Sequence, residues 1–173
     1  MRFDDVWMQP WQIGVLSDLA FRARNTGAAI EIGTHQGLSA IPIANTIYPN
    51  KLHVVDHWEG STDFRDYMRL RDNYGIFMDN VAEGTQGNIE VHKQDWRDFA
   101  QGWTKLIGFL HLDAEHTKDE VSAQISEFLP FMINGSLLAG DDYNWGGVRE
   151  GVAMHFNPGE VRVMRDKLWW VEF

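Results

Sequence analysis

The stretch Ala29-Ile30-Glu31-Ile32-Gly33-Thr34-His35-Gln36-Gly37-Leu38-Ser39 decides how the rest of the chain is interpreted. It begins as an apolar strand with one acid, passes through a loop with two glycines, and continues into an apolar segment typical of a helix. Glycine lets the backbone come close to a ligand, and a helix N-terminus presents free N–H groups. The stretch therefore predicts one wall of a site for a nucleotide-like ligand, although an ordinary strand–turn–helix explains it equally well.

Strand and helix patterns alternate along the rest of the chain. Strands are expected at residues 28–32, 51–55, 88–92, 106–112 and 136–139, and helices at 6–24, 39–48, around 63–72 and 77–82, at 117–132 and at 148–156. The tight turn Asp166-Lys167 joins two final strands, which predicts an antiparallel hairpin. The chain is thus expected to be one α/β domain over residues 1–173, with a helical segment (1–27) before a core (28–173). Its sheet is doubly wound, mostly parallel and seven-stranded, with helices on both faces.

Composition argues against some partners. The formal net charge is -10 and the pI is near 5.0, so the chain is a poor candidate for binding nucleic acid, which needs a basic face, whereas acidic side chains suit a divalent cation. There is no cysteine, hence no disulfide and no thiolate metal site. No window has the length of a membrane span and the N-terminus does not resemble a signal peptide, so we expect a soluble, cytoplasmic protein that binds no membrane.

Acidic residues recur where the expected parallel strands end. These positions are the Glu31–Gly37 loop, Asp56, Asp95, Asp113 and the pair Asp141-Asp142. Ligands of doubly wound sheets bind at the carboxyl ends of the strands. The repeated placement therefore predicts one shared site at that edge.

The first half of this edge suits a nucleoside better than a phosphate. Glu31-x-Gly33-x-x-x-Gly37 is not the dinucleotide pattern, and its acid favours a ligand with a cationic or neutral centre. Asp56 is placed to accept hydrogen bonds from ribose hydroxyls, and Trp58 to stack on a flat base. Asp95 could pair with an exocyclic amine beside Trp96. The alternative is that the acids are solvated strand ends and the aromatic residues pack in the core.

The second half of the edge predicts a metal. Asp113, Asp141 and Asp142 would converge if their strands are neighbours, and three carboxylates without a cation repel one another. Mg²⁺ takes oxygen ligands and keeps positions open for water and substrate. In the alternative, Asp141 or Asp142 only caps the next turn. Glu115 or His116 would be the general base, with His116 the weaker candidate.

The order of these motifs resembles class I S-adenosylmethionine-dependent methyltransferases from about Ala28 to the C-terminus. Leu112–Thr117, together with Gly140–Val152 and Phe156, is similar to the macrocin O-methyltransferase type, a methyltransferase-24-like group of small-molecule enzymes. The resemblance implies a Rossmann-like fold, S-adenosylmethionine as cofactor and Mg²⁺ as metal.

Carried onto this sequence, the resemblance places the loop under the methionine part of the cofactor, the ribose at Asp56 and the adenine near Asp95. The implied cofactor-binding residues are Glu31, Gly33, Thr34, His35, Gly37, Ser39, Asp56, His57, Trp58, Asp95, Trp96 and Asp113. The implied metal ligands are Asp113, Asp141 and Asp142, and the implied catalytic residues are Asp113, Glu115 and His116. Relatives commonly have Asp where this chain has Glu115, which leaves the identity of the base open.

The expected function is metal-assisted methylation of a hydroxyl on a small molecule. A metal-independent methyltransferase, a catalytically inactive module that binds the cofactor or a partner, and an enzyme that breaks down the cofactor remain alternatives. Acceptor contacts are expected from residues 1–24, 58–82 and 144–147. Since no lid domain is evident, either the acceptor is small or a second subunit closes the pocket, as in a homodimer.

Overall fold

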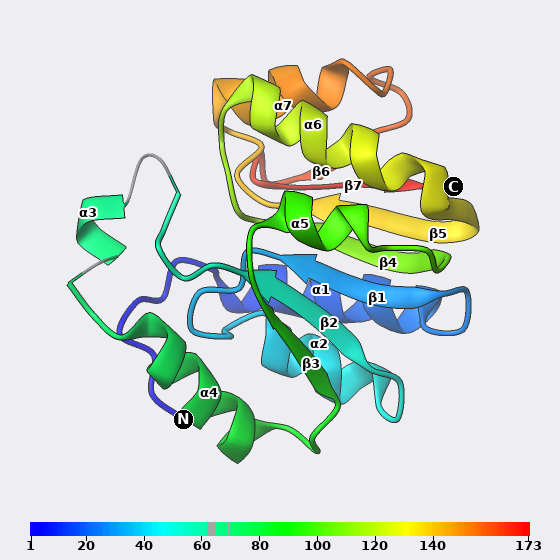
Figure 1. Ribbon diagram of the computed structural model, residues 1–173. Helices are drawn as coiled ribbons and strands as arrows, with labels where there is room; N and C mark the ends of the chain where they lie inside the picture. Colours follow the sequence, from blue (N-terminus) through cyan, green and yellow to red (C-terminus); the bar gives the residue numbers. More distant parts are fainter. Residues whose placement is uncertain (62–64, 69) are drawn as a thin grey trace.

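The computed structural model describes residues 1–61, 65–68 and 70–173, and over this part of the chain it forms one seven-stranded sheet between two layers of helices (Figure 1). The strand order is β3-β2-β1-β4-β5-β7-β6. The strands are β1 (Ala28–Ile32), β2 (Leu52–Asp56), β3 (Ile89–Lys93), β4 (Ile107–Leu112), β5 (Met132–Gly140), β6 (Arg162–Met164) and β7 (Leu168–Glu172). The first five are parallel, and β7 is antiparallel to both β5 and β6. The predicted fold class is confirmed.

Helices cover both faces of the sheet. They are α1 (Pro10–Ala23), α2 (Ala40–Ile47), α3 (Arg65–Met68), α4 (Asn73–Gly84), α5 (Trp96–Gln101), α6 (Lys118–Phe128) and α7 (Gly146–Ala153), with a 3₁₀ turn η1 (Leu129–Phe131). In Figure 1, α1, α2 and α4 lie on one side of the sheet and α5, α6 and α7 on the other. The helix expected around residues 63–72 falls partly outside the described residues, and α3 lies within it. No helix in the described ranges is both long and apolar enough to cross a bilayer.

Two element boundaries differ from the expectation for a clear reason. The first helix begins at Pro10 rather than Val6, because proline favours the first helical position. Helix α6 ends at Phe128, and Met132 starts β5 instead of continuing the helical face. Pro130 in the intervening 3₁₀ turn lacks the N–H that a continued helix requires.

Apolar clusters on the two faces hold the layers together. Leu16 of α1 and Ile43 of α2 are fully buried on one face, and Ile125 and Phe128 of α6 on the other. Every residue of β4 is buried, as expected of a central parallel strand covered on both faces. The central strands are therefore rigid supports for the loops that follow them.

The chain reverses its winding direction between β1 and β4. The neighbours β2 and β3 lie on one side of β1, whereas β4 and β5 lie on the other. The loops after β1 and β4 meet at this switch point: Gly33 has φ +82°, and a Cβ atom there would overlap the backbone carbonyl of Asp113. Ligands of open α/β sheets bind in the crevice at such a point.

Candidate active site

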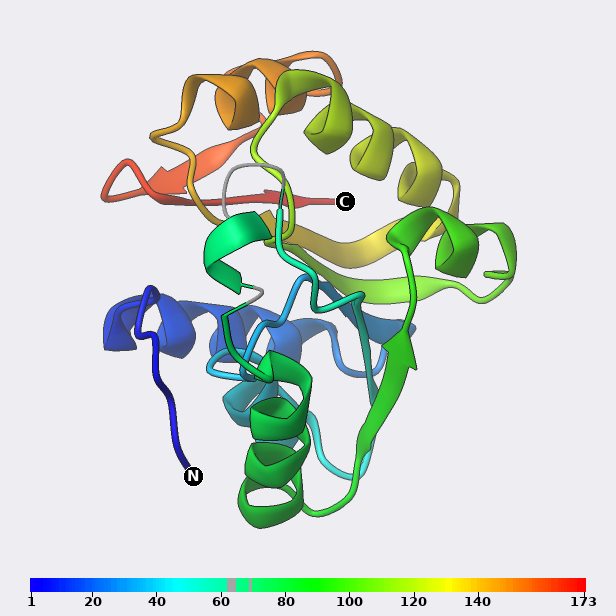
Figure 2. The same cartoon turned by 60° about the vertical axis from the view of Figure 1, so that its left-hand side comes forward.

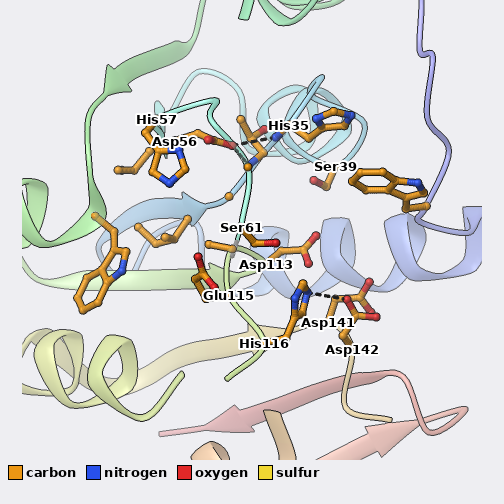
Figure 3. Close-up of a pocket in the computed structure, with 18 of the residues that line it drawn as sticks. His35, Ser39, Asp56, His57, Ser61, Asp113, Glu115, His116, Asp141 and Asp142 are labelled. Atoms are coloured by element: carbon orange, nitrogen blue, oxygen red, sulfur yellow. Dashed lines mark hydrogen bonds and ion pairs between the residues drawn. The ribbon is translucent and has the colours of Figure 1, made fainter. Parts of the chain in front are cut away.

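A cavity of about 720 Å³ lies at the carboxyl ends of the parallel strands. Thirteen of the predicted site residues line it: Gly33, Thr34, His35, Ser39, Asp56, His57, Asp95, Trp96, Asp113, Glu115, His116, Asp141 and Asp142. In Figure 3, Asp56 and His57 lie on one side of the cavity, His116, Asp141 and Asp142 on the opposite side, and Asp113 between them. The sheet thus brings both halves of the predicted site together.

Three predicted cofactor-binding residues do not line the cavity. Glu31 is fully buried beneath it, and its Oε1 lies 2.9 Å from Nδ1 of His111, which is equally buried. Gly37 (φ +87°) faces Phe77, with no side chain of its own to reach a ligand. Trp58 is 7% exposed and packs against core aromatic residues, so it is not free to stack on a base. These three residues support the site from below.

Asp56 organises the loop after β1. Its Oδ2 accepts hydrogen bonds from the backbone N–H groups of Thr34 and His35, at 3.0 Å each, and its Oδ1 accepts one from Trp58 N–H at 2.6 Å. A carboxylate has about four acceptor sites, so about one remains for a ligand. The expected ribose contact at Asp56 is therefore restricted to a single hydrogen bond, and the main observed role is to hold the loop.

Asp95 has a similar structural task. It is the N-cap of α5 and accepts a hydrogen bond from Arg97 N–H at 2.8 Å. The Arg97 guanidinium lies 4.4 Å from the centre of the Trp96 ring, which is 8% exposed and borders the cavity. One aromatic ring is thus held in the cavity wall where a flat base was expected.

The metal-ligating geometry differs from the predicted set. Asp113, His116 and Asp142 each offer one ligand atom, and the three atoms lie within 4.8 Å of one another. Asp141 is not in this group; its Oδ1 accepts a hydrogen bond from Gln12 Nε2 at 2.7 Å. His116 is thus in this compact group of candidate ligands, where Asp141 was expected. It also lies 3.1 Å from Asp142, through its Nε2.

A lysine outside the predicted site residues contacts this cluster. Lys167 Nζ lies 2.8 Å from Asp142 Oδ1 and 3.6 Å from Asp141 Oδ2. Burial alone would lower the pKa of Lys167, but the hydrogen bond to Asp142 and the charges of the neighbouring acids raise it overall. A resident cation thus already sits between two of the three aspartates.

The cluster nevertheless has an excess of negative charge. Burial, and then the charges of Asp141, Asp142 and Glu31, raise the pKa of Asp113 well above its ordinary value. Burial and the charge of Asp142 likewise raise the pKa of Asp141. Burial alone would also raise the pKa of Asp142, but hydrogen bonds from His116 and Lys167 lower it overall. Asp113 is thus the group that gains most from a further cation.

The N-terminal segment before α1, which lies within the range 1–24 expected to contact the acceptor, forms another wall of the cavity. Residues 5–8 line the cavity. The Asp5 carboxylate accepts hydrogen bonds from Tyr67 Oη at 2.7 Å and from Arg71 Nη1 at 2.9 Å, and lies 3.2 Å from His35 Nε2. The rings of Trp7 and His35 stack with centroids 4.9 Å apart. In Figure 1 this segment and α3 both lie at the left of the molecule, the part that Figure 2 brings forward.

Local sequence signals for these additional residues are weak. Lys167 belongs to the three-residue turn 165–167 between β6 and β7, and Gln12 is one polar residue on an otherwise apolar helix face. Their roles follow from topology: β7 is antiparallel to β5, so the turn before it lies beside the Asp141-Asp142 end of β5. Tyr143 N–H donates to the Lys167 carbonyl at 2.8 Å and fixes this contact.

A comparison with models of protein families identifies the family of this chain. The model of a methyltransferase domain matches residues 30–143, most of the chain. None of the curated proteins matches significantly.

Solved structures agree on the fold. Cofactor-bound Rv0187 from MTB has a TM-score of 0.73 at 17% identity, over 99% of this chain and 83% of that one. An O-methyltransferase from Bacillus cereus in complex with SAH has a TM-score of 0.70 at 17% sequence identity, over 99% of this chain and 84% of that one. The O-methyltransferase TomG from Streptomyces achromogenes, in complex with SAM, has a TM-score of 0.71 at 19% sequence identity, over 98% of this chain and 83% of that one.

Proposed function

The chain belongs to the methyltransferase domain family, and we propose that it transfers the methyl group of S-adenosylmethionine to a hydroxyl of a small molecule. The observation that carries the proposal is one cavity with two chemically different walls. The loop after β1 and the end of β2 form one wall, and the cluster of Asp113, His116 and Asp142 forms the other. A volume of about 720 Å³ suits a cofactor with a small acceptor rather than a macromolecule.

The cofactor wall fits S-adenosylmethionine in two respects. The left-handed backbone of Gly33 lets the loop after β1 pack against the backbone of Asp113, where a Cβ atom would not fit, and Asp56 fixes the N–H groups that follow. The other respect is charge: a sulfonium is a cation, and this cavity is lined by several carboxylates. Gly33, Thr34 and His35 would hold the methionine part, His57 and Asp56 the ribose, and Trp96 the base. Two of the solved relatives are described as complexes with this cofactor or its product.

The acceptor wall fits a divalent cation, although not the all-oxygen set first expected. Two carboxylates and one imidazole suit Mn²⁺ or a similar transition metal at least as well as Mg²⁺. The unbalanced charge that raises the pKa of Asp113 supports a cation at this point. A cation bound by Asp113, His116 and Asp142 would lower the pKa of an acceptor hydroxyl.

Residues of the chain itself would orient the acceptor and take its proton. The N-terminal segment, which contacts His35, and the loop of Trp145 would orient the acceptor, since residues 5–8 and Trp145 line the cavity. Holding the acceptor oxygen in line with the methyl group supplies much of the rate. With His116 engaged as a ligand, Glu115 in the same wall would take the hydroxyl proton. Lys167 would keep Asp142 anionic.

A metal-independent methyltransferase is the second candidate, and Lys167 is the specific observation in its favour. Its ammonium supplies positive charge at the aspartates without a metal. His116 would then be the base: Asp142 accepts its Nε2–H and leaves Nδ1 as the basic ring nitrogen. The two candidates assign different bases, so they can be separated by experiment.

The test is methyl transfer from labelled S-adenosylmethionine across a panel of catechols, sugars and other vicinal diols. Protein treated with chelator is compared with protein given Mg²⁺ or Mn²⁺. Metal-assisted transfer predicts turnover only with metal, lost in Asp113→Asn while cofactor binding is kept. Full turnover in chelator, lost in His116→Asn but kept in Glu115→Gln, would favour the metal-independent candidate. Cofactor binding without transfer to any acceptor would contradict both.

A further inference from the structure

A second cluster of metal-ligating side chains lies away from the cavity, on the outer strands of the sheet. His53 of β2 and Glu90 of β3 are register partners, and His92 follows Glu90 by two positions. Side chains two residues apart on a strand share a face, so all three project from the same face of the sheet. None of them is among the described residues that line the cavity.

Three ligand atoms of this cluster form a compact triangle. His53 Nδ1 lies 3.1 Å from His92 Nε2, and Glu90 Oε1 lies 3.8 Å from the first and 3.9 Å from the second. The circle through these atoms has a radius of about 2.1 Å, and typical Zn–N and Zn–O distances are about 2.0–2.2 Å. One ion can therefore touch all three atoms without a large movement of the chain.

We propose that His53, Glu90 and His92 bind a divalent transition metal of the zinc type, a site separate from the methyl-transfer cavity. Two imidazoles and one carboxylate are a common zinc donor set when water takes the fourth position. The Glu90 side chain is 42% exposed and that of His92 is 23% exposed, which leaves room for that water. The His53 side chain, at 8%, forms the closed side.

Packing holds the two imidazole rings in place before any metal arrives. The His53 ring meets the edge of Trp103 at 5.0 Å between centroids, and the His92 ring lies 4.7 Å from Phe99. Ligand side chains fixed by their neighbours lose little freedom on binding. Lys51 pairs with Glu90 through the other carboxylate oxygen, Oε2, at 3.3 Å, so Oε1 stays directed at the histidines.

The position of this cluster at the edge of the sheet predicts that a bound metal would stabilise the fold. Strand β3 is at one edge of the described sheet, and an unprotected edge strand is prone to fraying and to pairing with other chains. A metal held by His53 and by two residues of β3 would cross-link the edge to β2. Metal binding should therefore raise the thermal stability of the protein.

The test uses the full chain with Asp142→Asn, which removes one ligand of the cavity cluster and so separates the two sites. After chelator treatment and dialysis, the protein is titrated with Zn²⁺ by calorimetry and with Co²⁺ by visible absorption. We expect one ion per chain, a four-coordinate Co²⁺ spectrum, and a Tm that rises with Zn²⁺. Adding His92→Gln should weaken binding by roughly tenfold or more. Glu90→Gln, on an exposed side chain, should weaken it less.

His155→Gln on the same background is the matched control, because His155 is bonded to the Ser122 hydroxyl at 2.9 Å and belongs to neither cluster. Its Zn²⁺ affinity should equal that of Asp142→Asn alone. Absence of Zn²⁺ binding by folded Asp142→Asn protein, or equal affinity in its His92→Gln variant, would overturn the proposal. Either result would mean that the two histidines only share a hydrogen bond. Neither result bears on methyl transfer.

Discussion

Lys167 Nζ lies 2.8 Å from Asp142 Oδ1, so the turn of the C-terminal hairpin places a positive charge beside the aspartates of the cavity. The same ammonium lies 3.6 Å from Asp141, whose other oxygen is held by Gln12 of α1. The aspartates at the end of β5 are thus fixed from both the first helix and the last hairpin. Of the aspartates in this wall, Asp113 would gain most from a bound cation, because its pKa is raised well above the ordinary value.

Replacing Lys167 should distinguish a metal-assisted from a metal-independent site. In Lys167→Met a divalent cation no longer competes with the ammonium for Asp142, so we expect its affinity to rise by about tenfold. Turnover at saturating metal should be kept. Calorimetric titration with Mn²⁺ and the methyl-transfer assay measure these quantities. Lys118→Met, an exposed residue on α6, is the control. Loss of turnover at saturating metal in Lys167→Met alone would point to the ammonium as the working cation.

Asp113→Asn should make the metal-free protein more stable at neutral pH. Burial and neighbouring acids raise the pKa of Asp113 in the folded chain. Its contribution to stability is therefore complete below the ordinary carboxyl pKa and is lost as the pH rises through the raised value. An amide carries no charge to bury, so we expect a gain of about 1–2 kcal/mol at pH ~7.5, or roughly 3–6 °C in Tm.

Thermal unfolding in chelator at about pH 4 and pH 7.5 measures this effect. The gain should be absent at the lower pH, and Mn²⁺ should raise the Tm of the unaltered protein but not that of the variant. Asp79→Asn, an exposed position on α4, should change neither value. A variant that is less stable than the unaltered protein at both pH values would contradict the charge argument.

The placement of most cavity residues could be predicted because it depends on topology alone. Asp56 ends a parallel strand, Asp113 and Asp142 come just after two others, and the carboxyl ends of such strands lie together at one edge. The strand pattern and the final hairpin also came from local periodicity. These features need no knowledge of side-chain packing.

What the sequence did not yield depends on neighbours distant in the chain. Whether Glu31 faces a ligand or the core is decided by His111, its register partner on β4. Trp58 is turned inward by Tyr74 and Phe77 of α4. His116, and not Asp141, lies in the compact group of candidate ligand atoms, and Gln12 holds one carboxylate oxygen of Asp141. None of these contacts leaves a pattern in the local sequence.

Glu31→Gln should affect stability and not cofactor affinity. The carboxylate lies 2.9 Å from Nδ1 of His111 with both side chains fully buried, so the amide loses a charge-assisted hydrogen bond. We expect a cost of about 2 kcal/mol, or roughly 4–8 °C in Tm. The dissociation constant for S-adenosylmethionine should change by less than about twofold, which is close to 0.4 kcal/mol. Thermal unfolding and calorimetry measure the two effects. A large loss of affinity with unchanged Tm would return Glu31 to the cofactor-binding set.

Asp5→Asn should loosen the N-terminal wall of the cavity. Burial alone would raise the pKa of Asp5, but hydrogen bonds from Tyr67, Arg71 and His35 lower it overall, and burial lowers the pKa of His35. At neutral pH, Asp5 is therefore a carboxylate that accepts three hydrogen bonds. This contribution to stability is present above the ordinary carboxyl pKa and is lost as the pH falls through the lowered value.

An asparagine keeps the shape of Asp5 but removes the charge that holds Arg71, and a single amide oxygen cannot serve all three donors. We expect amides of residues 4–9 to exchange with solvent about tenfold faster, equivalent to about 1.4 kcal/mol of local opening. The KM for the acceptor should rise, and the affinity for S-adenosylmethionine should fall less, because the segment contacts the proposed cofactor-binding residues through His35. Hydrogen-exchange mass spectrometry and steady-state kinetics test this.

Asp4→Asn, next in the chain and paired with the exposed Arg2, should leave both the exchange rates and the KM unchanged. Equal exchange in the two variants would show that Asp5 does not hold the wall, and the acceptor would then have to be retained by the loop of Trp145 alone.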